Sequence, residues 1–319
     1  MVQFEDSSIP NVTGKIVLIT GGNTGLGYIA ALSLLSHDAS VYIFCRNAEK
    51  SQLAIASLSK AISNPNTQKL GFVQCDLSAM ASVRKAATEI LQRVKRIDIL
   101  MCNAGIMDFS NDGVTADGYE KHMATNHLGH ALLVKLLTPM LEESARGGEG
   151  DVRIVVLTSA TVNFFAPKEG IIFENLKTEQ KELSVEQRYA QSKLANILYV
   201  KELAKRYPKL LCLAIHPGLV ETGISYGGCQ GSWGDYLWTM FFNSVAKFCW
   251  KVCGAGMKSP EEGAWNQIWG CVGNREEMKS GEYYEPVGVE GKGVALTRDA
   301  GLGERLWEWT EGQLKLSAE

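Results

Sequence analysis

Residues 15–27 read KIVLITGGNTGLG, an apolar run that passes directly into a cluster of glycines. A short β-branched run bounded by turn residues is typical of a buried parallel strand. Glycines at such a turn let the backbone approach a pyrophosphate group at the positively polarised N-terminus of the next helix. We therefore expect a strand, a dinucleotide site and a helix in succession; a plain tight turn is the alternative. The site residues would be Gly21, Asn23, Thr24, Gly25, Leu26 and Gly27.

The alternation of strand and helix continues far beyond this turn. Apolar runs predict strands over 15–20, 40–45, 70–75, 97–102, 151–158 and 210–215. Helical patterns between them cover 25–36, 48–62, 79–94, 116–141 and about 185–206. This order predicts repeated β-α-β crossovers and a parallel sheet.

We predict an α/β fold, a single doubly wound Rossmann domain with a parallel sheet and a helical substrate-binding extension at its C-terminal end. No linker-like change of composition interrupts the series, so the domain is predicted to span residues 1–319. Within it we expect an N-terminal extension over 1–13, a cofactor-binding and catalytic core over 14–222, and a substrate-binding or lid region over 223–319.

The composition argues against several other classes of protein. With 45% hydrophobic and 21% charged residues, the chain is typical of a globular protein with a sizeable core. Its formal net charge of −3 provides no basic field for nucleic acid. Residues 1–11 show no basic-then-apolar run, so no targeting leader is expected. No apolar span reaches the roughly 18 residues of a transmembrane helix.

Cysteine and histidine usage gives no sign of a metal site. The eight cysteines form no Cys-x-x-Cys pair, and the five histidines lack the spacing of metal ligands. His127 and His130 lie three residues apart without a third ligand nearby, so we interpret both as structural. Scattered thiols are typical of a reducing compartment, and we expect a cytoplasmic protein.

The end of the second predicted strand indicates which dinucleotide would bind. An acidic residue there would hydrogen-bond a ribose 2′-hydroxyl and repel a 2′-phosphate. The strand instead ends in Phe44-Cys45-Arg46-Asn47, and a guanidinium pairs well with a phosphate. The residues favour NADP(H) as cofactor; the alternative is that Arg46 is a solvated residue at the start of a helix.

Tyr189 and Lys193 are candidates for proton transfer. Four residues apart in a predicted helix, they share one face. An ammonium group close to a phenol stabilises the phenolate and lowers the pKa of the phenol. A Tyr and a Lys at this spacing are more often a solvated pair, so other motifs must decide between the two interpretations.

Several further motifs follow in a consistent order, and with the glycine segment they carry a family resemblance. They are Asp76-Leu77, Asn103-Ala104-Gly105, the set Asn126, Ser159, Tyr189 and Lys193, and the segment from Pro217-Gly218 to Thr222. On these residues the chain resembles the short-chain dehydrogenase/reductase family from about residue 14 to residue 222. Finer features resemble its retinol-dehydrogenase-like branch: Cys45-Arg46-Asn47, YAQSKLAN at 189–196, and His216-Pro217-Gly218.

The resemblance implies a role for each matching residue. Ser159 would hold the substrate oxygen, Tyr189 would exchange a proton with it, and Lys193 would lower the pKa of Tyr189 and bind the nicotinamide ribose. Asn126 would position a water that connects Lys193 to solvent. The implied cofactor contacts are Gly21, Asn23, Thr24, Gly25, Leu26, Gly27, Arg46, Asn47, Asp76, Leu77, Asn103, Ala104, Gly105, Thr158, Tyr189, Lys193, Pro217, Gly218, Val220 and Thr222.

The sequence beyond residue 222 carries no motif that we can match. An aromatic stripe over 233–253 is compatible with a core helix, with a lid over an apolar substrate, or with a surface that meets a membrane or another subunit. The resemblance implies an apolar small-molecule substrate, and fold analogy suggests a homodimer.

We therefore expect an NADP(H)-dependent oxidoreductase that interconverts an apolar ketone or aldehyde and its alcohol. One alternative is an enzyme of the same fold without net redox chemistry, such as an epimerase, dehydratase or cyclase. A non-catalytic dinucleotide sensor is a third hypothesis, disfavoured because Tyr189 and Lys193 are both present.

Overall fold

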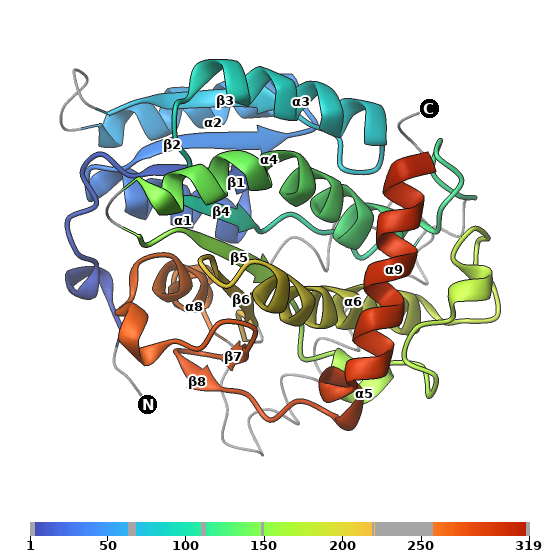
Figure 1. Ribbon diagram of the computed structural model, residues 1–319. Coiled ribbons are helices and arrows are strands. Elements are labelled where there is room, and N and C mark those ends of the chain that lie inside the picture. Colours follow the sequence, from blue (N-terminus) through green and yellow to red (C-terminus); the bar gives the residue numbers. More distant parts are fainter. Residues whose placement is uncertain are drawn as a thin grey trace.

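The structure, a computed structural model, describes residues 4–62, 68–109, 113–147, 150–218, 220 and 258–316. Within these ranges the chain forms an eight-stranded sheet flanked by helices (Figure 1), with strand order β3-β2-β1-β4-β5-β6-β7-β8. All neighbouring strands are parallel except β7 and β8. The predicted doubly wound α/β fold is confirmed. The predicted division of the chain at residues 13 and 222 remains a prediction.

The strands are β1 (Ile16–Thr20), β2 (Ser40–Cys45), β3 (Leu70–Gln74), β4 (Ile99–Cys102), β5 (Arg153–Leu157), β6 (Leu211–Ile215), β7 (Tyr283–Glu285) and β8 (Val289–Glu290). The helices are α1 (Gly25–Ser36), α2 (Ala48–Leu58), α3 (Met80–Arg93), α4 (Gly129–Arg146), α5 (Val162–Phe165), α6 (Val185–Arg206), α8 (Pro260–Val272) and α9 (Ala300–Leu316). A π-helical turn, η3 (Met123–Leu128), leads into α4. Short 3-10 turns are η1 (Asp6–Ser8), η2 (Ser59–Ala61), η4 (Phe173–Asn175), η6 (Arg275–Glu277) and η7 (Ala295–Arg298).

Two apolar cores lie on opposite faces of the sheet. On one face α1, α2 and α8 pack through residues such as Leu34, Leu58 and Ile268. On the other face α3, α4 and α6 pack through residues such as Ile90 and Leu133, and α9 joins this layer. Strands buried on both faces are nearly continuous in apolar residues, which explains why the runs at 16–20 and 211–215 could be recognised in the sequence.

The structure differs from the sequence prediction in two places. The helix predicted over 116–141 begins only at residue 121 and continues to Arg146. The chain first turns at Thr115–Tyr119, where Gly118 has a φ of +80° that a helix does not allow. Strands β7 and β8 were not predicted, because segments of three and two residues carry no periodic pattern.

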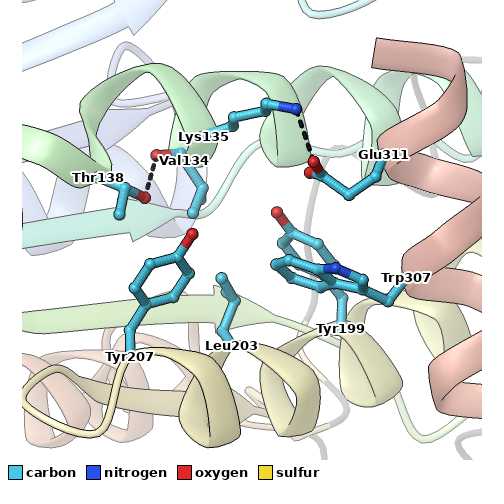
Figure 2. A pocket seen from close by; sticks show the side chains of 8 residues that line it. All are labelled: Val134, Lys135, Thr138, Tyr199, Leu203, Tyr207, Trp307 and Glu311. Carbon is cyan, nitrogen blue, oxygen red and sulfur yellow. Dashed lines mark hydrogen bonds and ion pairs between the residues drawn. The ribbon is translucent and has the colours of Figure 1, made fainter. Parts of the chain in front are cut away.

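Helix α9 lies across α4 and α6 (Figure 1) and is held there by mixed contacts. The Trp307 ring stacks on Tyr199 of α6 at 5.2 Å between centroids, and Glu311 pairs with Lys135 of α4 at 2.7 Å. Figure 2 shows these side chains around a small cavity of about 40 Å³ between the three helices. Its walls also include Leu203 and Tyr207. Such a space holds a few waters at most.

Among the helices that the structure describes, none combines the length and the apolarity that a membrane-spanning helix requires.

Candidate active site

A cavity of about 360 Å³ lies at the carboxyl ends of β1 to β4. The strand order reverses between β1 and β4, and doubly wound sheets bind ligands at such a point. The predicted cofactor residues that line the cavity are Gly21, Asn23, Arg46, Asp76, Leu77, Ala104 and Gly105. Its other lining residues are Phe44, Cys45, Cys75, Ser78, Ile106, Asp108, Thr115, Lys121 and Thr125. Of these, only Phe44 and Cys45 were singled out in the sequence, and most of the others adjoin a motif residue there.

The glycine turn after β1 is shaped for close backbone approach. Gly21 has a φ of +68°, a conformation that other residues rarely adopt. A Cβ atom on Gly27 would lie only 2.4 Å from the Gly21 carbonyl oxygen and from Asn103 Nδ2. Thr24 stands at the N-cap position of α1, so the turn delivers the chain directly into the helix. This arrangement fits a pyrophosphate at the helix N-terminus.

The segment after β4 is tied to this turn. Asn103 Nδ2 donates to the Thr20 carbonyl oxygen at 2.8 Å, and the Ala104 N–H donates to Thr20 Oγ1 at 3.0 Å. These bonds join two strand ends that lie more than eighty residues apart in the sequence. Gly105 follows, and a Cβ there would lie 3.1 Å from Lys193 Nζ. The cavity thus borders on the predicted catalytic residues.

The predicted adenosine side of the site contains three residues with different surroundings. The exposed Arg46 lines the cavity. Asn47 instead caps α2, its side chain accepting a hydrogen bond from the Lys50 N–H at 2.8 Å. Asp76 Oδ1 accepts bonds from the Ser78 N–H and hydroxyl at 2.9 and 2.6 Å, which fix its carboxylate at the cavity wall.

Asn126 lies in the π-helical turn, where the Gly129 N–H donates to the Ala124 carbonyl five residues earlier. Single π-turns occur frequently at functional sites. Asn126 Oδ1 accepts from the Ile106 N–H at 2.8 Å, and its Nδ2 donates to the Ile106 carbonyl at 3.0 Å and to Ser192 Oγ at 3.0 Å. The side chain therefore clamps the loop after Gly105 against α6.

Tyr189 and Lys193 occur one turn apart on α6, which begins at a Ser184–Gln187 capping box. Both are buried, and the Lys193 ammonium lies 5.7 Å from the centre of the Tyr189 ring. Lys193 Nζ donates to the Leu157 carbonyl at the end of β5, at 3.2 Å. The predicted shared face is confirmed, and the interpretation as a solvated pair is excluded.

Burial sets the direction of the pKa shift at both residues, and the expected influence of Lys193 on the pKa of Tyr189 stays a prediction. Burial raises the pKa of Tyr189 to about 12, and a hydrogen bond with Ser159 opposes this rise only in part. Burial also lowers the pKa of Lys193 to about 8. Removal from water disfavours the charged form of both groups, which raises the pKa of the phenol and lowers that of the ammonium.

Ser159 follows β5 and joins this group through its hydrogen bond with Tyr189. Ser159 Oγ also accepts from the Thr161 N–H at 3.2 Å. Thr158 Oγ1 donates to the Ile215 carbonyl at 3.2 Å, which connects β5 to the end of β6. The structure therefore brings Asn126, Ser159, Tyr189 and Lys193 together around the Gly105 end of the cavity.

The predicted segment over the nicotinamide is described only in part. Gly218 has a φ of +91° and its N–H donates to His216 Nδ1 at 3.3 Å. Val220 forms an isolated parallel bridge with Lys258. Pro217 lies between them and β6, whereas Thr222 and the aromatic stripe at 233–253 lie outside the described residues.

A buried pair next to Tyr189 was missed from the sequence. His122 Nδ1 lies 2.7 Å from Glu120 Oε1, and the Asp108 N–H donates to His122 Nε2 at 2.9 Å. Because Nε2 accepts, Nδ1 carries the proton and donates to the carboxylate. The His122 ring packs edge-on against Tyr189 at 6.3 Å between centroids. In the sequence, the only hint of this pair was that it lies a few residues before the predicted site residue Asn126.

The described cysteines lie in the protein core. The described cysteines are free and buried, and burial raises the pKa of thiols such as Cys75 to about 12. Over the part of the chain that the structure describes, no group of three or more His, Cys, Asp or Glu side chains could hold a metal ion.

Comparison with known proteins agrees with this arrangement. A family model described as short chain dehydrogenase matches residues 15–171. A short-chain dehydrogenase/reductase of Aspergillus calidoustus is 32% identical over 97% of this chain and 96% of its own length. Retinol dehydrogenase 11 of Mus musculus is 32% identical over 92% of this chain and 84% of its own length.

Solved structures share the fold. A protein from Mycobacterium paratuberculosis superposes with a TM-score of 0.71 at 24% identity, covering 98% of this chain and 97% of that one. A gluconate 5-dehydrogenase from Burkholderia cenocepacia, solved with NADP and tartrate, superposes with a TM-score of 0.62 at 20% identity, covering 87% and 95%. With the extensive sequence matches, these findings show that the chain is an enzyme of the short-chain dehydrogenase/reductase family and belongs to its retinol-dehydrogenase-like branch.

Proposed function

We propose that the protein is an NADP(H)-dependent oxidoreductase that interconverts an apolar ketone or aldehyde and its alcohol. The observation that carries the proposal is the convergence of Ser159, Tyr189 and Lys193 beside Gly105, at one end of the cavity that Gly21 and Arg46 also line. Such a constellation joins a proton donor to a dinucleotide site. The retinol dehydrogenase relative supports an apolar alcohol or carbonyl as substrate.

The residues of the cavity fit a phosphorylated dinucleotide. The glycine turn would hold the pyrophosphate, Asp76 and Leu77 would border the adenine, and Arg46 would pair with the 2′-phosphate. Lys193 would hydrogen-bond the nicotinamide ribose, with Asn103, Thr158, Pro217, Gly218 and Val220 around the nicotinamide end. Bound NADPH would supply the hydride.

Ser159 and Tyr189 would handle the substrate oxygen. Ser159 would hold it by a hydrogen bond, and Tyr189 would protonate it as the carbonyl is reduced. With a pKa of about 12, Tyr189 keeps its proton at neutral pH. The alkoxide that forms during reduction is a stronger base than a phenolate, so the proton transfer is favourable. In the reverse direction Tyr189 must first lose its proton, which favours alkaline conditions.

Asn126 would act by holding the Ile106 backbone and thereby the loop beside Lys193. This clamp defines one wall between the cofactor site and α6. A water that connects Lys193 to solvent would lie next to it.

A second candidate is an enzyme of this fold without net redox chemistry, such as an epimerase, dehydratase or cyclase. Such an enzyme could use the same Ser159, Tyr189 and Lys193. Transfer of deuterium from labelled NADPH into the product, detected by mass spectrometry, separates the two candidates.

The decisive experiment compares the wild type with Tyr189→Phe. We would follow NADPH oxidation with all-trans-retinal, decanal and an aromatic ketone as candidate substrates. The variant should lose about 10²–10⁴-fold in kcat, the usual contribution of a positioned proton donor, and should retain NADPH affinity. Full turnover by Tyr189→Phe on a substrate that the wild type reduces would refute the proposed mechanism.

We further propose a cytoplasmic setting, supported by the free thiols of the described cysteines. A homodimer and a peripheral membrane contact remain proposals. Size-exclusion chromatography with light scattering and vesicle co-sedimentation test them directly.

A further inference from the structure

His130 lies buried in α4, between the glycine turn and the π-helical turn, and is only 3% exposed. Its Nδ1 lies 3.0 Å from the Asn126 carbonyl oxygen, and its Nε2 lies 2.8 Å from Thr20 Oγ1. One imidazole therefore contacts both Thr20, which directly precedes the glycine turn, and Asn126, which holds the loop after Gly105.

The hydrogen-bond partners determine the state of this ring. Burial lowers the pKa of His130 to about 4, and the charge of Lys193 adds to the effect, so the ring is neutral at physiological pH. A carbonyl oxygen can only accept, so Nδ1 carries the proton and donates to Asn126. Nε2 is then an acceptor, and the Thr20 hydroxyl donates to it.

Both partners make further bonds that reach the predicted reaction centre. Thr20 Oγ1, oriented by His130, accepts the Ala104 N–H at 3.0 Å. Asn126 Oδ1 accepts the Ile106 N–H at 2.8 Å. The two ends of the 104–106 segment are therefore held by the two residues that His130 bridges, Thr20 through the same hydroxyl and Asn126 through its side-chain amide. Gly105 between them lies beside Lys193.

We propose that His130 is a positioning residue that fixes residues 104–106 between the cofactor turn and Lys193. The inference rests on the proposed function for its effect on NADP(H), although the structural coupling exists without a ligand. Replacing the imidazole removes the acceptor of the Thr20 hydroxyl and the side-chain donor to the Asn126 carbonyl. The Thr20 hydroxyl would then reorient toward the Met101 carbonyl, which lies 3.5 Å away. The glycine turn after Thr20 and the 104–106 segment would then no longer be held by the same side chain.

His127 provides a matched control from the same helical segment. It is also buried, with a pKa lowered to about 4 by burial. Its ring lies 3.3 Å from Asn196 Oδ1 and 2.9 Å from Thr310 Oγ1, on the side of α6 and α9. A phenylalanine at either position removes two hydrogen bonds from the core, so general destabilisation should be similar.

The first experiment measures the dissociation constant of NADPH by tryptophan fluorescence quenching. We expect His130→Phe to weaken binding by about tenfold, the effect of one or two lost hydrogen bonds, and Thr20→Val to weaken it similarly. The double variant should be no more than about twofold weaker than His130→Phe, since both changes break one connection. Thr20→Ser, which keeps the hydroxyl, should bind nearly as well as the wild type.

The second experiment measures amide hydrogen exchange of the wild type and the variants without any cofactor. His130→Phe and Thr20→Val should accelerate exchange in the peptide containing Ala104 and Ile106, whereas His127→Phe should leave this peptide unchanged. This measurement is independent of NADP(H). If the wild type binds neither NADPH nor NADH, the proposed function fails while the positioning role is still tested.

The proposal is overturned if folded His130→Phe shows wild-type exchange at 104–106, or if His127→Phe accelerates exchange there equally. Additive effects of Thr20→Val and His130→Phe on NADPH binding would also overturn it. If His130→Phe does not fold, Thr20→Val and Thr20→Ser are compared instead. Equal NADPH binding and equal exchange at 104–106 in these two variants would overturn the proposal.

Discussion

At the scale of single residues, burial dominates the chemistry of the site. Lys193 was expected to stabilise the phenolate of Tyr189 and so to lower the pKa of Tyr189. In the structure, burial shifts the pKa of each side chain in the direction that favours its neutral form. A neutral phenol suits a proton donor, and a lysine whose pKa is about 8 titrates close to physiological pH.

The buried charge of Lys193 should reduce stability, so Lys193→Met should raise it. The pKa falls from 10.5 to about 8 on burial, which corresponds to about 3 kcal/mol. Loss of the bond to the Leu157 carbonyl offsets about 1 kcal/mol. Urea unfolding at pH 7 should therefore show the inactive variant to be about 2 kcal/mol more stable than the wild type.

The sign of the pH dependence provides the control for this prediction. Between pH 8 and 10.5, folded wild-type protein loses the Lys193 proton while the unfolded chain keeps it. The stability of the wild type therefore rises through this window relative to Lys193→Met. The advantage of the variant should shrink at pH 9.5. An advantage that is constant from pH 7 to pH 9.5 would show that the Lys193 charge is not its cause.

Arg46 should determine the preference between the two dinucleotides. Arg46→Asp should raise the apparent KM for NADPH far more than that for NADH, because it removes a phosphate partner and adds a like charge. A lost charged hydrogen bond of this kind costs about 1.5–3 kcal/mol. Steady-state kinetics with both cofactors measures the ratio. Equal changes in the two KM values would show that Arg46 does not contact the phosphate.

At the scale of elements, α9 is notable because it covers α4 and α6 with residues from the end of the chain. The Arg206 guanidinium lies 4.3 Å from the centre of the Trp307 ring, which in turn stacks on Tyr199 (Figure 2). Both contacts of the ring come from α6. This packing joins α9 to α6, the helix that carries Tyr189 and Lys193.

Trp307→Ala should destabilise the protein by about 2 kcal/mol, less than a fully buried tryptophan because the ring is partly exposed. Glu311→Ala removes a partly exposed ion pair with Lys135 and should cost less than about 1 kcal/mol. Glu308→Ala, on the exposed face of α9, is the control and should be neutral. Chemical unfolding of the three variants tests the order. A Trp307→Ala variant as stable as Glu308→Ala would contradict the docking of α9.

At the scale of the whole molecule, one side chain connects the C-terminal part to the central sheet. Asn266 in α8 is completely buried, and its Nδ2 donates to the carbonyls of His216 at 2.6 Å and Tyr284 at 3.2 Å. Its Oδ1 accepts from the Gly288 N–H at 2.9 Å. It therefore joins β6, β7 and the following turn to one helix.

Asn266→Leu should cost about 3 kcal/mol, because it removes three hydrogen bonds and leaves only the Tyr284 carbonyl with another partner, the His216 N–H. Asn266→Asp keeps the acceptor for Gly288 but loses both donated bonds, so it should also be destabilised. Asn274→Ala, which removes an exposed cap that accepts from the Glu276 N–H, should cost about 1 kcal/mol. Thermal unfolding measures all three. Equal losses of stability for Asn266→Leu and Asn274→Ala would show that the three hydrogen bonds of Asn266 contribute no more than an exposed helix cap.

The sequence by itself determined the features that depend on local pattern. The six strands from 16 to 215, the glycine turn and the helix that carries Tyr189 and Lys193 were all predicted, because strand burial, turn chemistry and four-residue spacing are visible along the chain. Asn126 and Ser159 were named through the family resemblance and not through such a local pattern.

Only the tertiary structure decided what depends on contacts between distant segments. The depth of burial that shifts the pKa values of Tyr189 and Lys193 depends on packing from both sides of α6. The bonds of His130 join residues 110 positions apart in sequence, and no local pattern records such a connection. Strand β7, which pairs with β6, and the docking of α9 were likewise set by partners far away in the chain. Periodicity shows which face of an element is apolar, but desolvation and hydrogen bonding depend on what that face meets.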